Sequence, residues 1–350
     1  MWLSNLQHPT KNEIEEHDLS LSDEQAMIQE TALKFSETLL EPNAGALDEG
    51  KGREALLANL KTLSENGFMG LNVSADYGGT EAGTVSFALA IEALARGCAS
   101  TAVTASVSNM VGEVIQAVGS EDQKATYLPK LTDGTYPAGA FCLTESSAGS
   151  DPSAMKTRAV KDGNHYVLNG SKLYISSGEY AGVFVVWAVT DPDAPKGKGI
   201  SCFLVEAGTP GLIISKAEKK MGQTGSATNE IVFQDCRIPA TAMMGEENDG
   251  FRVAVSELAG GRIGVASLAL GIARKAMDTA KAYVNERQQF GKPLADMQGI
   301  QWMIADRETD LEAARLLILQ AASLKDAGHP FAKEASMAKL FASEAAQRAT

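Results

Sequence analysis

The stretch FCLTESSAGSDPSA, residues 141–154, changes character within a few positions. An apolar run, Phe141 to Leu143, leads directly into residues 144–151, which carry hydroxyl side chains, carboxylates and one glycine. Such a segment at the end of a strand is typical of a solvated turn. It is also typical of a backbone that holds a polar group against an apolar wall, because glycine lets backbone amides approach an anion closely. The residues alone leave both interpretations open.

The composition indicates an ordinary globular protein with more than one domain. The chain has 350 residues, of which 44% are hydrophobic and 21% are charged, and a single core rarely grows to this length. The 31 Lys and Arg residues against 44 Asp and Glu leave a net charge of −13, which argues against a nucleic-acid partner. The histidines are scattered and form no metal-binding motif; they are His8, His17, His165 and His329.

The sequence predicts a cytoplasmic protein without targeting segments. Its four cysteines are widely spaced and form no C-x-x-C pair, which indicates reduced core thiols. The N-terminal region is acidic at Glu13, Glu15, Glu16 and Asp18, whereas a transit peptide is basic. No uninterrupted apolar run approaches the ~20 residues that a membrane span needs.

Helical patterns occupy the N-terminal third of the chain. Residues 1–136 predict an α-helical domain. Within it, Ser22 with Gln25 and Ser120 with Gln123 have the spacing of capping boxes, which mark the first turn of a helix.

Between residues 137 and 240 the hydrophobic period changes to two. TRAVKDGNHYVLNG predicts a hairpin with Asp162-Gly163 at its turn. The runs VFVVWAVT, GISCFLVEA and NEIVFQDCRIP are rich in β-branched and aromatic residues. Residues 137–240 are therefore expected to form a central antiparallel β domain, as a small sheet or barrel.

Residues 241–350 predict a C-terminal helical bundle. The first long pattern is interrupted only by Gly260-Gly261, and two further helical patterns follow. The last pattern runs to the end of the sequence, so we expect an incomplete bundle with its last helix or helices missing. On this last helix an apolar stripe would lack a partner: Phe331, Ala335, Ala338, Phe341 and Ala342. The predicted fold class is α+β.

Five segments resemble the acyl-CoA dehydrogenase family in the same order. CLTESSAGSDPSA, residues 142–154, resembles the signature segment of that family. The others are LNGSKLYISSG (168–178), MGQTGSATNEIVFQDCRIP (221–239), GRIGVASLALGIAR (261–274) and ERQQFGKPLADMQGIQ (286–301). The resemblance covers almost the whole chain and is strongest to short-chain and bacterial members. It implies an FAD-dependent oxidoreductase of fatty-acid β-oxidation.

The resemblance gives the opening stretch a role in FAD binding. It implies that Phe141, Leu143 and Thr144 lie along the flavin, with the Thr144 hydroxyl near the pyrimidine edge. Gly149 would let backbone amides approach the pyrophosphate, and Ser150 would add a hydroxyl donor. Ser150 is also expected to contact the substrate.

A second wall of the flavin site is expected at LYISSG. The family usually has Trp where Tyr174 stands and Thr where Ser176 stands, so an aromatic face and a hydroxyl near flavin N5 are kept. Without the resemblance, Tyr174 would be a half-buried strand aromatic. Arg287, Phe290 and Gln298 match positions that reach the FAD of a neighbouring subunit. The complete site is thus expected only in a homotetramer or homodimer; in a monomer, the same residues would be ordinary surface positions.

The resemblance also identifies a substrate residue but no catalytic base. Arg262 matches a residue of the acyl-CoA channel, although Ala259 replaces the aspartate that the family often has three positions earlier. The family's chemistry needs a carboxylate to remove the α-proton of the thioester, while the β-hydrogen leaves as hydride to the flavin. One family position for this base is Gly261 here, and the other is expected beyond residue 350, in a chain that we expect to be truncated. Glu257, one helical turn before Gly261, is a weak candidate only.

Three functions follow as alternatives. The first is dehydrogenation of an acyl-CoA to the 2-enoyl-CoA, with electrons passed to an electron-transfer flavoprotein. The second is a flavin-dependent monooxygenase on the same fold, which needs no carboxylate base. The third is a catalytically silent scaffold that binds flavin or acyl-CoA, which the chain could be if its base is missing. The sequence does not indicate which acyl chain is preferred.

Overall fold

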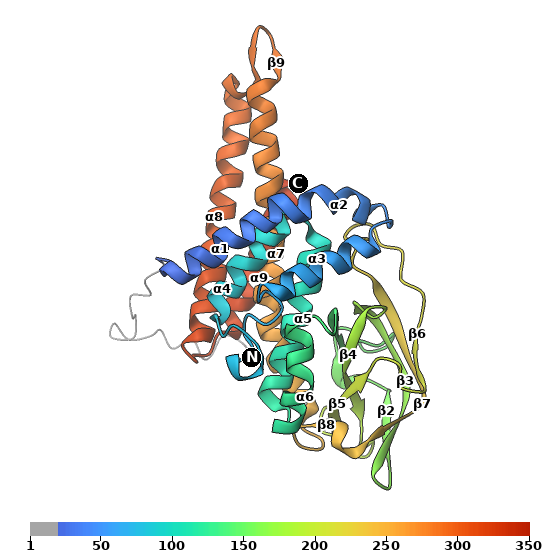
Figure 1. Cartoon of the computed structure of the whole chain (residues 1–350). Coiled ribbons are helices and arrows are strands. Elements are labelled where there is room, and N and C mark those ends of the chain that lie inside the picture. The colour runs from blue at the N-terminus through green and yellow to red at the C-terminus, as the bar shows by residue number, and fades with distance from the viewer. Residues whose placement is uncertain (1–19) are drawn as a thin grey trace, which may run out of the picture.

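The computed structural model describes residues 20–350 and places a sheet domain beside a large helical body (Figure 1). The predicted fold class, with a β domain between two helical segments, is confirmed. The N-terminal helices are α1 (Asp23–Phe35), the π-helical turn η1 (Ser36–Leu40), α2 (Glu41–Asp48), α3 (Arg53–Glu65), α4 (Gly83–Gly97), α5 (Ala99–Val118) and α6 (Glu121–Thr132). The C-terminal helices are α7 (Gly250–Glu286), α8 (Gln298–Asp326) and α9 (Ala332–Ala349).

Both predicted capping boxes are present. The Ser22 hydroxyl accepts a hydrogen bond from the backbone N–H of Gln25 at 3.2 Å, and the Ser120 hydroxyl accepts one from Gln123 at 3.2 Å. The Gln123 side chain also donates to the carbonyl oxygens of Thr241, at 2.8 Å, and of Met243, at 3.0 Å. One cap therefore starts α6 and ties it to the end of the β domain.

The β domain is an eight-stranded sheet in the order β6-β7-β3-β2-β4-β5-β8, with β1 pairing with β4. Its strands are β1 (Ala138–Cys142), β2 (Arg158–Asp162), β3 (His165–Ser176), β4 (Ala181–Val189), β5 (Ile200–Glu206), β6 (Leu212–Ile214), β7 (Thr228–Pro239) and β8 (Met243–Met244). Most neighbours are antiparallel, as predicted, and β2 and β3 form the expected hairpin. However, β4 pairs in parallel with both β1 and β2. This is possible because neither pair is joined by a tight hairpin.

Helix α7 runs unbroken through Gly260 and Gly261, so the expected interruption there is wrong. Glycine weakens a helix only modestly, and close packing compensates for it here. A Cβ on Gly261 would lie 2.9 Å from the Met110 sulfur, and one on Gly264 would lie 2.5 Å from the Ser106 hydroxyl. Because Gly261 and Gly264 have no side chains, α5 can approach α7 closely. Of the described helices, only α7 is long and apolar enough for a membrane span, and half of that apolar window is buried inside the protein, as in a core helix.

The stripe on α9 that was expected to lack a partner is covered. Its Ala335, Ala338 and Ala342 are buried, together with Ala345, in a core shared with α7 and α8, and Phe331 and Phe341 pack against that core while partly buried. Val85 and Leu89 of α4 join the same core. An N-terminal helix therefore packs into the C-terminal bundle, which the sequence pattern of residues 241–350 could not reveal. The opposite face of α9 presents Met337 and Leu340, which are 46% and 64% exposed.

Gly271 tests the close approach of α7 to α4. A Cβ at this position would overlap the backbone carbonyl of Glu92, which cannot move aside as a flexible side chain could. We expect Gly271→Ala to lower the free energy of unfolding by about 1–3 kcal/mol. Gly45→Ala, in α2, is the matched control, because its Cβ meets no atom within 4 Å; we expect it to gain up to about 1 kcal/mol. Equal effects of the two changes in denaturant titrations would contradict this packing.

Candidate cofactor and acyl-CoA site

A buried ion pair fixes the segment after β1. Lys172 is fully buried and Glu145 nearly so, and the Lys172 ammonium donates to the Glu145 carboxylate at 2.8 Å and to the Leu143 carbonyl at 3.1 Å. The same carboxylate accepts the backbone N–H groups of Lys156, at 2.6 Å, and of Thr157, at 3.0 Å. Burial acts to raise the pKa of Glu145, but the Lys172 ammonium and these hydrogen bonds outweigh it and hold that pKa below its usual value. These contacts hold residues 143–157, between β1 and β2, in one conformation; this segment is called the pinned loop below.

This loop lies against the segment that was predicted as the second wall. The backbone N–H of Leu173 donates to the Thr144 carbonyl at 2.8 Å. Because Tyr174 follows Leu173, this hydrogen bond places Thr144 close to Tyr174 in space. Tyr174 has a left-handed backbone, with φ 58°, and its side chain is 66% exposed. The pairing of β3 with β7 is irregular between Lys172 and Ile175, where this residue stands. A strained residue with an exposed ring is typical of a functional site.

The other predicted wall residues differ in what they present. Phe141 is half-buried and packs on Trp187, with ring centroids 4.3 Å apart. Leu143 is buried in the core beneath, so its side chain points away from the surface and its carbonyl is held by the buried lysine. Ser176, at the end of β3, is half-buried.

Gly149 and Ser150 form the exposed end of the pinned loop. A Cβ at Gly149 would meet no atom within 4 Å, so this glycine faces open space. Next to it, Asp151 accepts from the Ser153 hydroxyl and pairs with Lys196. An exposed ring, nearby hydroxyls and an open glycine turn fit the ring and the phosphates of FAD.

Arg287, Phe290 and Gln298 lie elsewhere. Helices α7 and α8 project beyond the rest of the chain as a hairpin, whose tip holds the short strands β9 (Gln288–Gln289) and β10 (Lys292–Pro293) (Figure 1). All three residues are exposed on this tip, and Phe290 is 93% exposed. The hairpin places these residues close to one another and far from the sheet domain of the same chain (Figure 1).

Arg262 lines an apolar cavity of about 270 Å³ between α5, α7 and α9. The other lining residues are Ser106, Val107, Met110, Leu258, Gly261, Val265 and Lys339. No carboxylate is among these described residues. The cavity could therefore hold an apolar chain beside a cationic side chain, but its walls offer no base.

A second cavity, of about 520 Å³, lies at the first turns of α7. It contains the cationic side chains of Lys196, Lys198 and Arg252; Arg252 is engaged by Asp249, at 2.5 Å. Within the part of the chain that the structure describes, no ion pair engages Lys198. Val255 of this cavity stands three and seven residues before Leu258 and Arg262 of the apolar cavity, so both cavities open on one face of α7.

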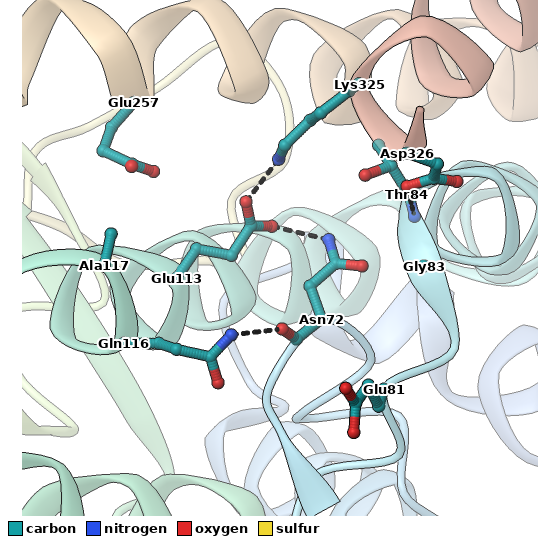
Figure 2. A pocket seen from close by; sticks show the side chains of 10 residues that line it. All are labelled: Asn72, Glu81, Gly83, Thr84, Glu113, Gln116, Ala117, Glu257, Lys325 and Asp326. Carbon is teal, nitrogen blue, oxygen red and sulfur yellow. Dashed lines mark hydrogen bonds and ion pairs between the residues drawn. The ribbon is translucent and has the colours of Figure 1, made fainter. Parts of the chain in front are cut away.

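Glu257 lines a third cavity, of about 390 Å³, between α5, α7, α8 and the loop before α4 (Figure 2). There Glu113 accepts from the Asn72 amide at 2.6 Å and pairs with Lys325. Burial, and then the charge of Glu113, raise the pKa of Glu257 to about 7, although Lys325 partly opposes them. Glu257 does not line the cavity of Arg262, even though it stands only one turn before Gly261.

Sequence reasoning missed Lys172. The sequence feature that could have indicated it is a single lysine in the middle of a predicted strand, 27 residues after Glu145, which follows another strand. Nothing in either segment alone indicates that the two side chains meet. The cationic cavity was missed as well, because Lys196 and Lys198 come from a loop and Arg252 from a helix.

The raised pKa of Glu257 gives a stability prediction. The usual pKa of this carboxyl is 4.5 and its folded value is about 7. Between these values the folded chain binds the proton more tightly than the unfolded chain, so stability is lost as pH rises through this window. We expect Glu257→Gln to be more stable than wild type at pH 8, by up to ~3 kcal/mol, and equal to it near pH 4. Glu344→Gln, on the exposed face of α9, is the control in denaturant titrations across this range; a pH-independent effect at Glu257 would refute the assignment.

Comparison with known proteins covers nearly the whole chain. Residues 22–135, 140–236 and 248–350 match the N-terminal, middle and C-terminal domains of acyl-CoA dehydrogenases, respectively. The chain is 46% identical to an acryloyl-CoA reductase (NADH) of Anaerotignum propionicum, over 97% of this chain and 86% of that protein. It is similar to the solved butyryl-CoA dehydrogenase of Megasphaera elsdenii, with a TM-score of 0.90, 40% identity, and coverage of 95% of this chain and 87% of that one. A chain in a structure of the electron transferring flavoprotein of Acidaminococcus fermentans also has a TM-score of 0.90, with 41% identity and coverage of 94% and 86%.

Proposed function

Because the chain belongs to the acyl-CoA dehydrogenase family, we propose that it dehydrogenates an acyl-CoA thioester between its α and β carbons. FAD is the cofactor of this family and therefore of this chain. One observation supports the proposal most directly: an apolar cavity that contains Arg262 and a cationic cavity that contains Lys198 and Arg252 open on one face of α7. An apolar end and a phosphate-binding end are what an acyl-CoA requires.

We assign the cofactor site to the pinned loop and the end of β3. The Tyr174 ring would lie against the flavin, and the Thr144 and Ser176 hydroxyls would donate hydrogen bonds to its polar edge. Gly149 and Ser150 would hold the pyrophosphate through backbone N–H groups and a hydroxyl. When bound, FAD supplies the acceptor for the hydride that leaves the β carbon. The chain's own residues position the ring and screen it from water.

The substrate would lie along α7. Val255 and Val265, one in each cavity, are separated by about 15 Å along the helix, at 1.5 Å per residue. The pantetheine arm of CoA can span this separation. Arg262 would then lie near the thioester and Lys198 near the nucleotide phosphates, where a charge-assisted contact is favourable.

We propose that the catalytic base is a residue other than those that line the apolar cavity. No carboxylate lines that cavity among the described residues, and Glu257 lines a different one. The charged groups that act on Glu257 are Glu113 and Lys325, in a cavity that Arg262 does not line. We therefore propose that Glu257 is not the base.

The projecting hairpin supports an assembly of at least two chains. Arg287, Phe290 and Gln298 would reach the FAD of a partner copy, in a homodimer or homotetramer. Exposed aromatic side chains at Tyr283, 58%, and Trp302, 62%, are surfaces that a partner would cover. We further propose an electron-transfer flavoprotein as the electron acceptor, a cytoplasmic location, and domains at residues 1–136, 137–240 and 241–350.

A second candidate is the same reaction in the opposite direction. The similarity to an acryloyl-CoA reductase favours it, because that relative is 46% identical over most of both chains. The groups that bind and orient the thioester would be the same in both directions. The direction is then decided by the electron donor or acceptor rather than by the residues of the cavity.

Anaerobic spectroscopy of the FAD-loaded protein tests the proposed function. We expect a saturated acyl-CoA to bleach the oxidised flavin, because the thioester donates two electrons without another reductant. The acyl-pantetheine thioester is the matched control: it has the same reacting atoms but no nucleotide, and should need a higher concentration. Binding without bleaching would support a silent scaffold, and oxygen-dependent hydroxylation that requires added reduced flavin would support a monooxygenase. Re-oxidation of dithionite-reduced flavin by a 2-enoyl-CoA would support the reductase direction.

Gly149→Val tests the position of the pyrophosphate. Since a Cβ here meets no protein atom within 4 Å, the fold should accept the side chain, with a change in unfolding free energy within about 0.5 kcal/mol. The added methyl groups would instead occupy the approach to the backbone amides, so we expect FAD affinity to fall at least tenfold. Flavin-fluorescence titration and thermal unfolding of the same preparation provide the comparison. Unchanged FAD affinity in a folded variant would place the pyrophosphate elsewhere.

A further inference from the structure

We propose that Lys172 is a positioning residue of the FAD site. Its side chain contacts the backbone carbonyl of Leu143 and the carboxylate of Glu145, and through them it holds the loop that carries Thr144, Gly149 and Ser150. The inference rests on the FAD site assigned above and adds a residue to it. It also gives the ion pair with Glu145 a function that stability alone does not explain.

Among residues 20–350, the polar contacts of the Lys172 side chain are all with one segment, residues 143–155. Its ammonium lies 3.1 Å from the Leu143 carbonyl oxygen, 2.8 Å from a Glu145 carboxylate oxygen and 3.7 Å from the Met155 sulfur. Leu143 precedes Thr144 directly. The ammonium therefore sets the position of the peptide that leads into the predicted flavin wall, from the side opposite to solvent.

Glu145 extends this control to the far end of the loop. Its carboxylate accepts from the ammonium of Lys172 and from the backbone N–H groups of Lys156 and Thr157. One carboxylate thus holds residues that lie on both sides of the Gly149-Ser150 turn. A short bridge between Glu145 and Ala148 completes the start of the turn. Both ends of the turn are therefore attached to one carboxylate.

A neighbouring hydrogen bond couples the loop to β3. Leu173, which follows Lys172, donates its backbone N–H to the Thr144 carbonyl at 2.8 Å. The Lys172 side chain and the Leu173 backbone N–H of β3 therefore bind two successive carbonyl groups of the loop, those of Leu143 and Thr144. Tyr174 follows directly, so the two predicted walls share one anchor.

Stability alone is a weak reason for such a pair. Burying two charges costs desolvation free energy, and replacing a buried pair with apolar residues of similar volume is often neutral or stabilising. An apolar pair, however, has no acceptor for the Lys156 and Thr157 amides and no donor for the Leu143 carbonyl. The ion pair gives the loop one geometry, which an apolar pair of equal stability would not give.

This difference defines the experiment. The variants are Lys172→Met, Glu145→Leu and the double change, and FAD binding is measured by fluorescence titration of the apoprotein without acyl-CoA. The single changes leave a buried charge unpaired, so we expect both to lower the melting temperature and FAD affinity. The double change removes both charges. We expect its melting temperature to recover most of the loss, whereas its FAD affinity stays at least tenfold below wild type.

Two further variants keep the proposal testable if the double change does not fold. Glu145→Asp retains the charge but shortens the side chain by one methylene, so it should pull on the loop. We expect it to shift the visible spectrum of bound flavin and to lower FAD affinity at least threefold. The control is Glu92→Leu with Arg274→Met, another ion pair at 3.0 Å in the helical bundle, in which Glu92 is buried and Arg274 is partly exposed. This control should change stability without changing the flavin spectrum.

Wild-type FAD affinity in a folded double variant, or an unchanged flavin spectrum and affinity in Glu145→Asp, would overturn the proposal and leave the pair a purely structural role. Failure of the proposed function has a different signature. In that case the wild-type protein binds FAD but no acyl-CoA bleaches it, while the ranking of the variants in FAD affinity is unaffected.

Discussion

The arrangement of the helices depends on how closely α7 is approached by its neighbours. Gly264 faces Ser106 and Phe87, and Gly271 faces the backbone of Glu92, so α4 and α5 lie against bare backbone. A helix with side chains at these positions would hold its neighbours further away. The apolar cavity lies along the same pair of helices and is lined by Met110 of α5 and by Gly261 and Arg262 of α7. The contact between α5 and α7 therefore helps to close the bundle and also borders the candidate acyl site.

The sheet domain depends on a different kind of constraint. The pinned loop contains few apolar side chains, and hydrophobic burial alone would not give it a single conformation. The Lys172–Glu145 pair supplies directional contacts in a place where water is excluded, and such contacts are stronger than in solvent. Tyr174 keeps a left-handed backbone next to this anchor. Strain at that residue can persist because the strand on one side and the loop on the other are both fixed.

The sequence predicted what depends on neighbours along the chain. The capping boxes at Ser22 and Ser120 depend on residues three positions apart, and the strands depend on a two-residue hydrophobic repeat. Both could therefore be predicted from the sequence. The continuity of α7 and the covering of the α9 alanines depend on other helices, and both were missed. In the candidate site, the family motifs assigned Thr144 and Tyr174 to one flavin site, and the structure places their segments side by side. The Lys172–Glu145 pair was not predicted, because it is a tertiary contact between two polar residues. Side-chain direction was also beyond the sequence: Leu143 was expected on the flavin and its side chain points into the core.

The projecting hairpin is the part of the chain that would couple the proposed cofactor binding to the proposed assembly. Helix α7 has 37 residues and α8 has 29, so the longer one measures about 55 Å at 1.5 Å per residue. The half of the hairpin near α9 is packed in the core, whereas the tip with Phe290 stands clear of the chain (Figure 1). Two long continuous helices, joined by ion pairs such as Lys281–Glu308, cannot fold back to bring Arg287 to the sheet of the same chain. If Arg287 contacts FAD, that FAD belongs to another copy, and FAD then binds the assembled form more tightly than the separate chain. By linkage, FAD must stabilise the assembly by the same free energy.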